Sequence, residues 1–495
     1  MLDEYRDQYV EFNASWMREH YLHLSGQKSE LELADIYDRH SGLFTEASIA
    51  GLRQHLAALP QHYEADRVAV GRLLLFAIEH FEESAAKELT ESLSRYEGEA
   101  ATEWRGQKLT FQDCAVAVRT QHDRDARRVI HQRREDMIEA SNEMRAARTS
   151  SVHGTARKLG FSSYIALYEQ MRKIDYAALA HAASSVISRT EPVYTRRLSE
   201  ALKRDLGIPI EKAERSDALF LLHMAGYDDR FPGTELLRTY EATMAGLGIR
   251  AGEQRNILID SEPRPRKSSR AFCVPISIPD DVRLVLRAMG GQTDYQALLH
   301  EAGHAQHYGW TSPDLKPEFK YTGDYALTET YAFLFNHLIT EREWLAESLG
   351  FRDSESFILS ATLARLLTLR RYVAKLTYEC ELHKGGDISQ VRESYGELQT
   401  EATGFRTSSA EFLFDIDDGF YSANYLRAWA LEVAFADYLR TRFGKSWWRS
   451  RRAGGFLKEL WETGERFTAD EIAAQLGLGP ISFDALSDEF NRALN

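Results

Sequence analysis

The chain has 495 residues, and its 75 acidic against 61 basic side chains give a formal net charge of −14 at pH 7. Hydrophobic residues make up 43% and charged residues 27% of the sequence, which is ordinary for a soluble globular protein and excludes general disorder. The acidic balance and the lack of a basic tract argue against nucleic acid or an anionic membrane as a partner, and no apolar run approaches the roughly 20 residues of a membrane span.

The start of the sequence and its cysteines indicate a cytoplasmic location. Residues 1–6 are charged and show no basic segment followed by an apolar stretch, so we expect no signal peptide. The cysteines Cys114, Cys273 and Cys380 are widely spaced, which argues against a disulfide framework and fits a reducing compartment. The length suggests two or three structural units, or one large two-lobed body.

Most of the chain is predicted to be helical. Proline is scarce, with 11 in 495 residues, and over half of them lie between Pro263 and Pro317, so long helices can form elsewhere. Apolar residues recur at three- and four-residue spacing in several segments. These segments are 67–95, 155–171, 176–190 and 360–384, the last of which ends at Gly385 and Gly386.

One segment breaks the helical pattern. Residues 271–279 and 282–286 are rich in β-branched side chains, and a Pro-Asp-Asp break separates them, so we predict a small β-hairpin. Its prolines place it at the edge of a sheet. Such an edge could pair with an extended peptide, although an ordinary hairpin that covers the core explains the same pattern.

Residues 300–304 form an HExxH motif. His300 and His304 are four residues apart, so on a helix they share one face and can bind a single metal ion. Glu301 can then take a proton from the attacking water. Two histidines on a solvated helix face are the alternative interpretation of the same spacing.

The residues around this motif predict a real helix. Thr293 and Gln296 have the spacing of a capping box, so the helix is expected to start there. Asp294 could orient a ligand histidine, but more simply it favours the helix N-terminus. Gly303 would allow another segment to approach the helix closely.

Zinc held by two histidines needs a third protein ligand and an open position for water. Glu329, 25 residues after His304, lies in the first turns of a second predicted helix and is the preferred ligand. Asp324 is expected in the preceding loop or at the helix cap. His307 could be a ligand, a substrate contact or a surface residue, and we expect the last; His337 is expected to be structural. The predicted cofactor is one Zn²⁺ ion, although the same ligands accept Co²⁺ or Mn²⁺.

These residues resemble the oligoendopeptidase F and thimet oligopeptidase type of zinc metallopeptidase. The specific part is segment 293–307, which is similar to that family's HExxH signature, with Glu329 where the family has its third ligand. Ala271 stands where the family often has glycine. Weaker similarity covers segments 156–164, 270–273 and 369–383. The resemblance therefore spans roughly residues 150–440, and the preceding part carries no specific motif.

The resemblance implies an all-α, bilobed shell around a deep catalytic channel, with a small β-hairpin at the cleft edge. Zinc would lie at the channel floor, and the narrow entrance would admit short peptides rather than folded proteins. The implied organisation is an N-terminal helical region, residues 1–150, and a catalytic region, residues 151–495. The implied reaction is cleavage of internal peptide bonds, and the oligomeric state stays open.

A late segment departs from the family pattern. The family places a histidine and tyrosines there to stabilise the oxyanion, but residues 414–429 contain no histidine. The resemblance assigns this role to Tyr425, with Tyr421 as second choice and Arg427 as a further alternative. Two packing tyrosines are the simpler interpretation. The acidic residues Asp415, Asp417 and Asp418 are expected to be caps or solvated charges, with binding of a substrate amino terminus as the alternative.

The sequence thus predicts a zinc-dependent metallopeptidase in which His300, His304 and Glu329 hold the ion and Glu301 is the general base. One alternative is a metallo-exopeptidase or an amidase on the same site. Another is a catalytically weak, zinc-containing protein that binds peptides, which the missing histidine makes conceivable. Retention of Glu301 beside the three ligands speaks against it, because a purely structural zinc site closes its fourth position.

Overall fold

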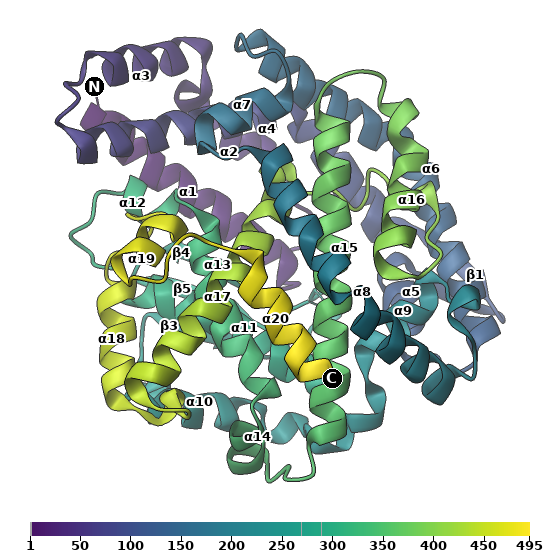
Figure 1. Ribbon diagram of the computed structural model, residues 1–495. Coiled ribbons are helices and arrows are strands. Elements are labelled where there is room, and N and C mark those ends of the chain that lie inside the picture. The colour runs from purple at the N-terminus through teal and green to yellow at the C-terminus, as the bar shows by residue number, and fades with distance from the viewer. Residues whose placement is uncertain (1, 269, 289) are drawn as a thin grey trace.

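The computed structural model describes residues 2–268, 270–288 and 290–495, and it is mostly helical (Figure 1). This confirms the predicted fold class. The helices of the first half are α1 (Leu2–Leu24), α2 (Ala34–Arg39), α3 (Glu46–Ala58), α4 (Glu64–Glu99), α5 (Phe111–Thr120), α6 (Arg124–Lys158), α7 (Tyr164–Arg172), α8 (Tyr176–Leu206), α9 (Arg215–His223) and α10 (Leu236–Gly246).

The second half contains the helix of the HExxH motif, α11, and the helix of the third predicted ligand, α13. Its helices are α11 (Gln292–Trp310), α12 (Glu318–Tyr321), α13 (Tyr325–Asn336), α14 (Arg342–Leu349), α15 (Glu355–His383), α16 (Arg392–Thr403), α17 (Tyr421–Phe443), α18 (Arg451–Trp461), α19 (Ala469–Gln475) and α20 (Phe483–Leu494). The C-terminal helix α20 returns to pack beside α8 and α15 (Figure 1).

Three of the four helices predicted from periodicity are confirmed inside longer helices. Segments 67–95, 176–190 and 360–384 fall largely within α4, α8 and α15, and α15 ends just before Gly385, whose φ is +93°. The prediction of one helix over 155–171 is wrong. Gly160, at φ +90°, ends the first helical stretch, and the Ser163 side chain then accepts a hydrogen bond from Ala166 N–H as the cap of α7.

Two small sheets complete the described part of the chain. Strands β1 (Ala101–Trp104) and β2 (Gln107–Thr110) form an antiparallel pair that the sequence did not predict. The predicted hairpin is confirmed as β4 (Phe272–Ser277) and β5 (Asp281–Val285), and the proline-containing β4 is an edge strand as expected. A further strand, β3 (Ile257–Asp260), pairs in parallel with β5. Helix α11 packs against β4 and β5, so this sheet lies beside the HExxH motif.

The buried apolar side chains form two main cores. One unites α1–α4 with α7, α8, α20 and much of α15, and the other unites α10, α11, α13, α14 and α18 with β5. Helix α17 contributes to both, since Leu426 belongs to the first core and Leu439 to the second. Helix α13 does the same through Phe333 and Leu334. Helix α13, which packs on the HExxH helix α11, and helix α17, which contacts Glu329 of α13, therefore both lie where the two cores meet.

Residues 1–150 share the first core with helices from the rest of the chain. The predicted division between residues 150 and 151 falls inside α6, so this point of the chain is no linker. Cys114, Cys273 and Cys380 are all free thiols. Within the described residues, none of the helices combines the length and apolar character needed to cross a membrane.

Candidate functional site

The HExxH helix begins at glycines rather than at the predicted capping box. Gly291, at φ +90°, is the N-cap of α11 and provides no side-chain cap, so the predicted roles of Thr293 and Gln296 are wrong. The Asp294 carboxylate instead accepts a hydrogen bond from Gly290 N–H at 2.7 Å. This places Asp294 in the first turn, where its charge favours the positive end of the helix dipole, as the simpler expectation had it.

Gly303 brings together the two helices that carry the candidate ligands. A Cβ atom at this position would lie 2.5 Å from Ala332 Cα and 2.7 Å from the Tyr331 carbonyl oxygen, so only glycine allows α13 to cross α11 this closely. The expected close approach is therefore made by α13. Because the helices touch at Gly303, Glu329 on α13 comes opposite His300 and His304 on α11.

His300, His304 and Glu329 converge on one point. Their ligand atoms all lie within 4.8 Å of one another. Glu329 Oε2 is 3.3 Å from His300 Nε2 and 3.6 Å from His304 Nε2. This oxygen is buried and has no hydrogen-bond partner among the described residues, as expected of an atom whose partner is a metal ion. Two imidazole nitrogens and a carboxylate oxygen suit zinc, so the residues present fit the predicted ion.

The candidate ligand His304 contacts Thr328, which no sequence motif indicated. His304 Nδ1 lies 2.9 Å from Thr328 Oγ1, and His307 Nδ1 lies 3.1 Å from the same oxygen. If His304 Nδ1–H donates to the hydroxyl and the hydroxyl donates to His307, the Nε2 lone pair of His304 is directed to the metal point. The expectation that His307 lies on the surface is wrong, because it is fully buried, with Thr328 and Tyr331 of α13 against its ring. The only sequence signal for Thr328 was its place directly before Glu329.

The carboxylate of Glu329 contacts Tyr421, which the sequence had predicted as a site residue. Tyr421, the first residue of α17, donates its hydroxyl hydrogen to Glu329 Oε1 at 2.7 Å. This leaves Oε2 as the free atom of the carboxylate. Tyr421 is therefore placed to orient the candidate ligand Glu329, whereas the sequence had suggested it as a second choice for contact with the oxyanion.

Glu301 lies between the ligands and the edge strand β4. Burial raises the pKa of its carboxyl group, and the neighbouring charge of Glu329 acts in the same direction. The neighbouring imidazoles of His300 and His304 and a backbone hydrogen bond from Cys273 in β4 oppose this shift. A carboxylate with a raised pKa that borders the metal point is suited to accept a proton from water.

Tyr425 lies one helical turn after Tyr421 and faces the same region. Its ring centroid is 5.2 Å from that of Tyr421 and 5.8 Å from that of Phe333, which in turn packs on His300. Burial raises its pKa strongly, with smaller effects from the charges of Glu329 and Glu301. Within the described residues its hydroxyl makes no hydrogen bond, so it is free to donate to a bound molecule.

Arg427 is not available for oxyanion binding. Its guanidinium forms a bidentate pair with Asp324, at 2.7 and 2.8 Å, and a further ion pair with Asp470 at 2.6 Å. Asp324 also caps α13 by accepting from Ala326 N–H, as expected. These two ion pairs join α13, α17 and α19, so they hold α13, the helix that carries Glu329, in place. His337 is buried, with its Nδ1 2.9 Å from Glu432 Oε2, which agrees with the expected structural role.

The acidic residues before α17 all form ion pairs, and Asp418 is also exposed, as expected of a solvated charge. Asp415 pairs with Arg371, Asp417 with Lys375 at 2.8 Å, and Asp418 with Arg148 at 2.6 Å. The alternative that they receive a substrate amino terminus is therefore disfavoured, because each already has a cation. They bind the segment before Tyr421 to α15 and α6.

Glu465 is a buried carboxyl group that no sequence motif indicated. It is 1% exposed, and its oxygens accept no hydrogen bond from the described residues. Burial raises its pKa to about 8, opposed by the charge of Arg72. It lies against Gly323, just before α13, and is electrostatically coupled to the candidate ligand His304.

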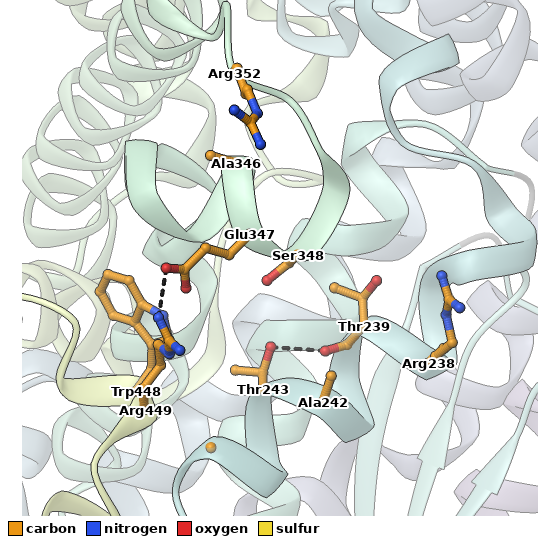
Figure 2. Close-up of a pocket in the computed structure, with 11 residues that line it drawn as sticks. Arg238, Thr239, Ala242, Thr243, Ala346, Glu347, Ser348, Arg352, Trp448 and Arg449 are labelled. Carbon is orange, nitrogen blue, oxygen red and sulfur yellow. Dashed lines mark hydrogen bonds and ion pairs between the residues drawn. The ribbon is translucent and has the colours of Figure 1, made fainter.

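A separate surface hollow of about 870 Å³ is lined by α10, α14 and the stretch around Trp448 (Figure 2). Thr239 and Thr243 on α10 face Glu347 and Ser348 on α14 across it (Figure 2). None of the predicted site residues lines this hollow, so the candidate site remains the junction of α11, α13 and α17.

Comparisons with known proteins identify the fold. Neither protein-family models nor curated proteins give a match to the sequence. Among solved structures, PZ peptidase A with an inhibitor matches at a TM-score of 0.71 and 15% identity, over 98% of this chain and 90% of that one. A protein described as oligoendopeptidase F from Bacillus anthracis matches at 0.65 and 14%, over 97% and 88%. The M32 carboxypeptidase from Deinococcus radiodurans matches at 0.60 and 13%, over 99% and 98%. The chain thus has a fold found in peptidases.

Proposed function

We propose that this protein is a zinc-dependent metallopeptidase that hydrolyses internal peptide bonds of short oligopeptides. The observation that carries the proposal is the convergence of His300, His304 and Glu329, with the buried Glu329 Oε2 left without a hydrogen-bond partner. Glu301 stands beside this point, as a hydrolytic site needs. The shared fold with peptidases supports the choice of a peptide as substrate.

The side chains around the candidate metal point have different roles in the proposed reaction. When bound, Zn²⁺ supplies Lewis acidity for the scissile carbonyl and the attacking water. Glu301 accepts the proton of that water and passes it to the leaving amine. Tyr425 donates a hydrogen bond to the carbonyl oxygen as negative charge develops there. Tyr421 and Thr328 keep Glu329 and His304 in position.

The substitution Glu301→Gln tests this function. We expect the variant to keep one zinc ion per chain and to lose activity by about 10²-fold or more, because only the proton acceptor is removed. Glu343→Gln, at an exposed position of α14, is the matched control and should retain full activity. Wild-type activity should vanish with a chelator and return with added zinc. A fully active Glu301→Gln variant would rule out the mechanism.

Mass spectrometry of a defined pool of short peptides separates the proposed reaction from its alternatives. Internal cuts by the wild type and none by Glu301→Gln would establish an endopeptidase. Release of single residues from one end would favour the exopeptidase alternative, for which the fold match to a carboxypeptidase gives a reason. A zinc-loaded wild type that binds the peptides without cutting them would favour the binding protein.

A further inference from the structure

The turn that leads into α17 has an unfavourable backbone conformation. Gly419 has a φ of +63°, and Phe420, directly before the first residue of α17, has a φ of +58° and a ψ of +44°. A residue with a Cβ atom rarely adopts this left-handed region, because the Cβ atom comes too close to a backbone carbonyl oxygen. Such a conformation persists only where the surrounding contacts impose it, and it is concentrated at functional sites.

Phe420 differs from the other residues of this kind. Among the described residues, three further non-glycine residues have a positive φ, namely Arg105, Lys173 and Met224. Arg105 lies in the loop between β1 and β2, where the twist of a hairpin favours positive φ. Lys173 and Met224 end α7 and α9, and helices commonly end in a left-handed residue. Phe420 precedes an α-helix instead and is fully buried, so its conformation neither closes a hairpin nor ends an α-helix.

Contacts from three helices hold the two left-handed residues. The Gly419 N–H donates a hydrogen bond to the hydroxyl of Tyr164, the first residue of α7, at 2.9 Å. The ring of Phe420 stacks on Tyr176 of α8 at a centroid distance of 4.2 Å, and it meets His383 of α15 edge-on at 5.1 Å. The turn is therefore fixed both through its backbone and through its buried ring.

Glu379 of α15 contacts both ends of the turn. Its buried carboxylate accepts a hydrogen bond from the Asp417 N–H at 2.7 Å, before the turn, and another from the Ser422 hydroxyl, after it. Tyr421 lies between these two contacts and donates its hydroxyl hydrogen to Glu329 Oε1 at 2.7 Å. The path of the turn therefore sets the position from which Tyr421 reaches the candidate metal ligand.

The charged contact of the turn is an ion pair between Asp418 and Arg148 of α6. Arg148 donates to both carboxylate oxygens of Asp418, at 3.0 and 2.6 Å. Its Nε–H donates to Thr90 Oγ1 of α4 at 3.0 Å, so the guanidinium is itself held in place. Such a two-pronged contact restricts direction as well as distance. Half of the Asp418 side chain is exposed, so removal of its charge changes this contact without opening a cavity in the core.

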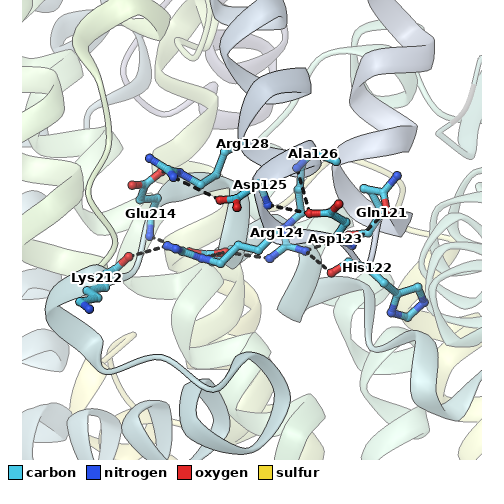
Figure 3. A network of polar contacts seen from close by, with 11 residues as sticks. Gln121, His122, Asp123, Arg124, Asp125, Ala126, Arg128, Lys212 and Glu214 are labelled. Carbon is cyan, nitrogen blue, oxygen red and sulfur yellow. Dashed lines mark hydrogen bonds and ion pairs between the residues drawn. The ribbon is translucent and has the colours of Figure 1, made fainter. Parts of the chain in front are cut away.

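Another ion pair of α6 holds a segment with ordinary backbone conformation. Figure 3 shows Arg128 directed to Glu214, with which it pairs at 2.9 Å directly before the first turn of α9. Residues 210–217, all of which the structure describes, include none with a positive φ. The Arg128 pair therefore resembles the Arg148 pair in chemistry and in its helix, but it does not hold a strained turn.

We propose that Arg148 and Asp418 are positioning residues of the candidate metal site. By holding the turn 418–420 in its strained form, they keep Tyr421 on Glu329 Oε1 and so leave the other carboxylate oxygen to the metal ion. This inference rests on the proposed zinc site. It gives a role to the N-terminal helical region, because Arg148 belongs to residues 1–150, which carry no specific sequence motif.

Zinc affinity tests the proposal on folded protein without any turnover. We expect Asp418→Asn and Arg148→Gln each to weaken zinc binding by about 10-fold, the lower end of the range for loss of a group that orients a metal ligand. Competition against a chromophoric chelator gives the affinity, and urea unfolding verifies that each variant is folded. Arg128→Gln is the matched control, since it removes the pair of Figure 3 from the same helix and should leave zinc affinity unchanged.

A double variant shows whether the effect passes through Tyr421. Once Tyr421→Phe has removed the hydroxyl, the position of the turn no longer acts on Glu329, so adding Asp418→Asn should cause no further loss of zinc affinity. Unchanged zinc affinity of Asp418→Asn would overturn the proposal. Independent losses that multiply in the double variant would overturn it too, because a merely structural pair does not act through this hydroxyl. Asp418→Asn decides the question even if Arg148→Gln fails to fold.

The outcome is separable from that of the proposed function. A wild type that binds zinc and cleaves peptides, together with unchanged zinc affinity of Asp418→Asn, would sustain the peptidase and overturn the positioning role. A wild type that binds zinc and cleaves no peptide, together with the expected loss in Asp418→Asn, would sustain the positioning role and overturn the peptidase. A wild type without zinc affinity would overturn both.

Discussion

The hydroxyl of Tyr421 donates a hydrogen bond to Glu329 Oε1 at 2.7 Å, and this contact decides which oxygen of the carboxylate faces His300 and His304. Tyr421 is the first residue of α17, whereas Glu329 lies on α13. The candidate metal point therefore depends on how two helices from distant parts of the chain pack. The hydrogen bond also gives the two neighbouring tyrosines of α17 different roles, because within the described residues the Tyr425 hydroxyl makes no such bond.

Tyr421→Phe should weaken metal binding. Removal of the hydroxyl frees Glu329 to rotate, and loss of a partner that orients a metal ligand costs about 10- to 100-fold in affinity. Competition for zinc against a chromophoric chelator measures this directly. Activity should recover when zinc is added in excess, since the other groups stay in place. Equal zinc affinity of Tyr421→Phe and the wild type would contradict the orienting role.

Tyr425→Phe should lower turnover and leave metal binding unchanged. Its hydroxyl makes no hydrogen bond within the described part of the chain, and loss of a donor to developing negative charge costs about 10²–10³-fold in kcat. Steady-state kinetics at saturating zinc, with the zinc content measured on the same sample, tests this. A kcat within twofold of the wild type would assign Tyr425 to packing against Phe333 and Tyr372 only.

Gly303→Ala should destabilise the protein and disturb the metal site. The added methyl group would meet the α13 backbone at 2.5 Å, and such overpacking costs about 1–3 kcal/mol or more. Gly455→Ala is the matched control, because this exposed helical glycine of α18 has open space around it and alanine should stabilise the helix by about 1 kcal/mol. Urea unfolding of both variants measures the difference. A Gly303→Ala variant as stable as the wild type would show that α13 can move away from α11 to accommodate the added methyl group.

The candidate ligands could be predicted from sequence because helix spacing alone places His300 and His304 on one face. The same rule could not reveal what covers that face, so His307 was expected at the surface although α13 buries it. The bond between Tyr421 and Glu329 joins residues 92 apart, and no local pattern fixes the packing of their helices. Arg427 was a candidate for catalysis because its partner Asp324 lies 103 residues away and no local pattern could identify that pair.

A pair of buried histidines lies away from the candidate site and affects stability instead. His153 Nε2 and His383 Nδ1 are 2.8 Å apart, and the residues are 4% and 2% exposed. Burial lowers the pKa of His153 to about 4, with a smaller effect from the charge of Arg157. Burial, and then the charge of His153, lowers the pKa of His383 well below its usual value. Tyr164 packs against both rings.

This pair should make the protein less stable in mild acid. Each folded-state pKa lies below the unfolded value of about 6.5, so the unfolded chain binds more protons and stability falls as pH drops from 7 towards 4. Between pH 7 and 5 the loss should reach about 2 kcal/mol for each imidazole. Urea unfolding at the two pH values should show a smaller loss for a His153→Gln/His383→Gln double variant than for the wild type. His181→Gln, at an exposed position of α8, should behave as the wild type does. An equal loss in the double variant and the wild type would show that the pair does not titrate on unfolding.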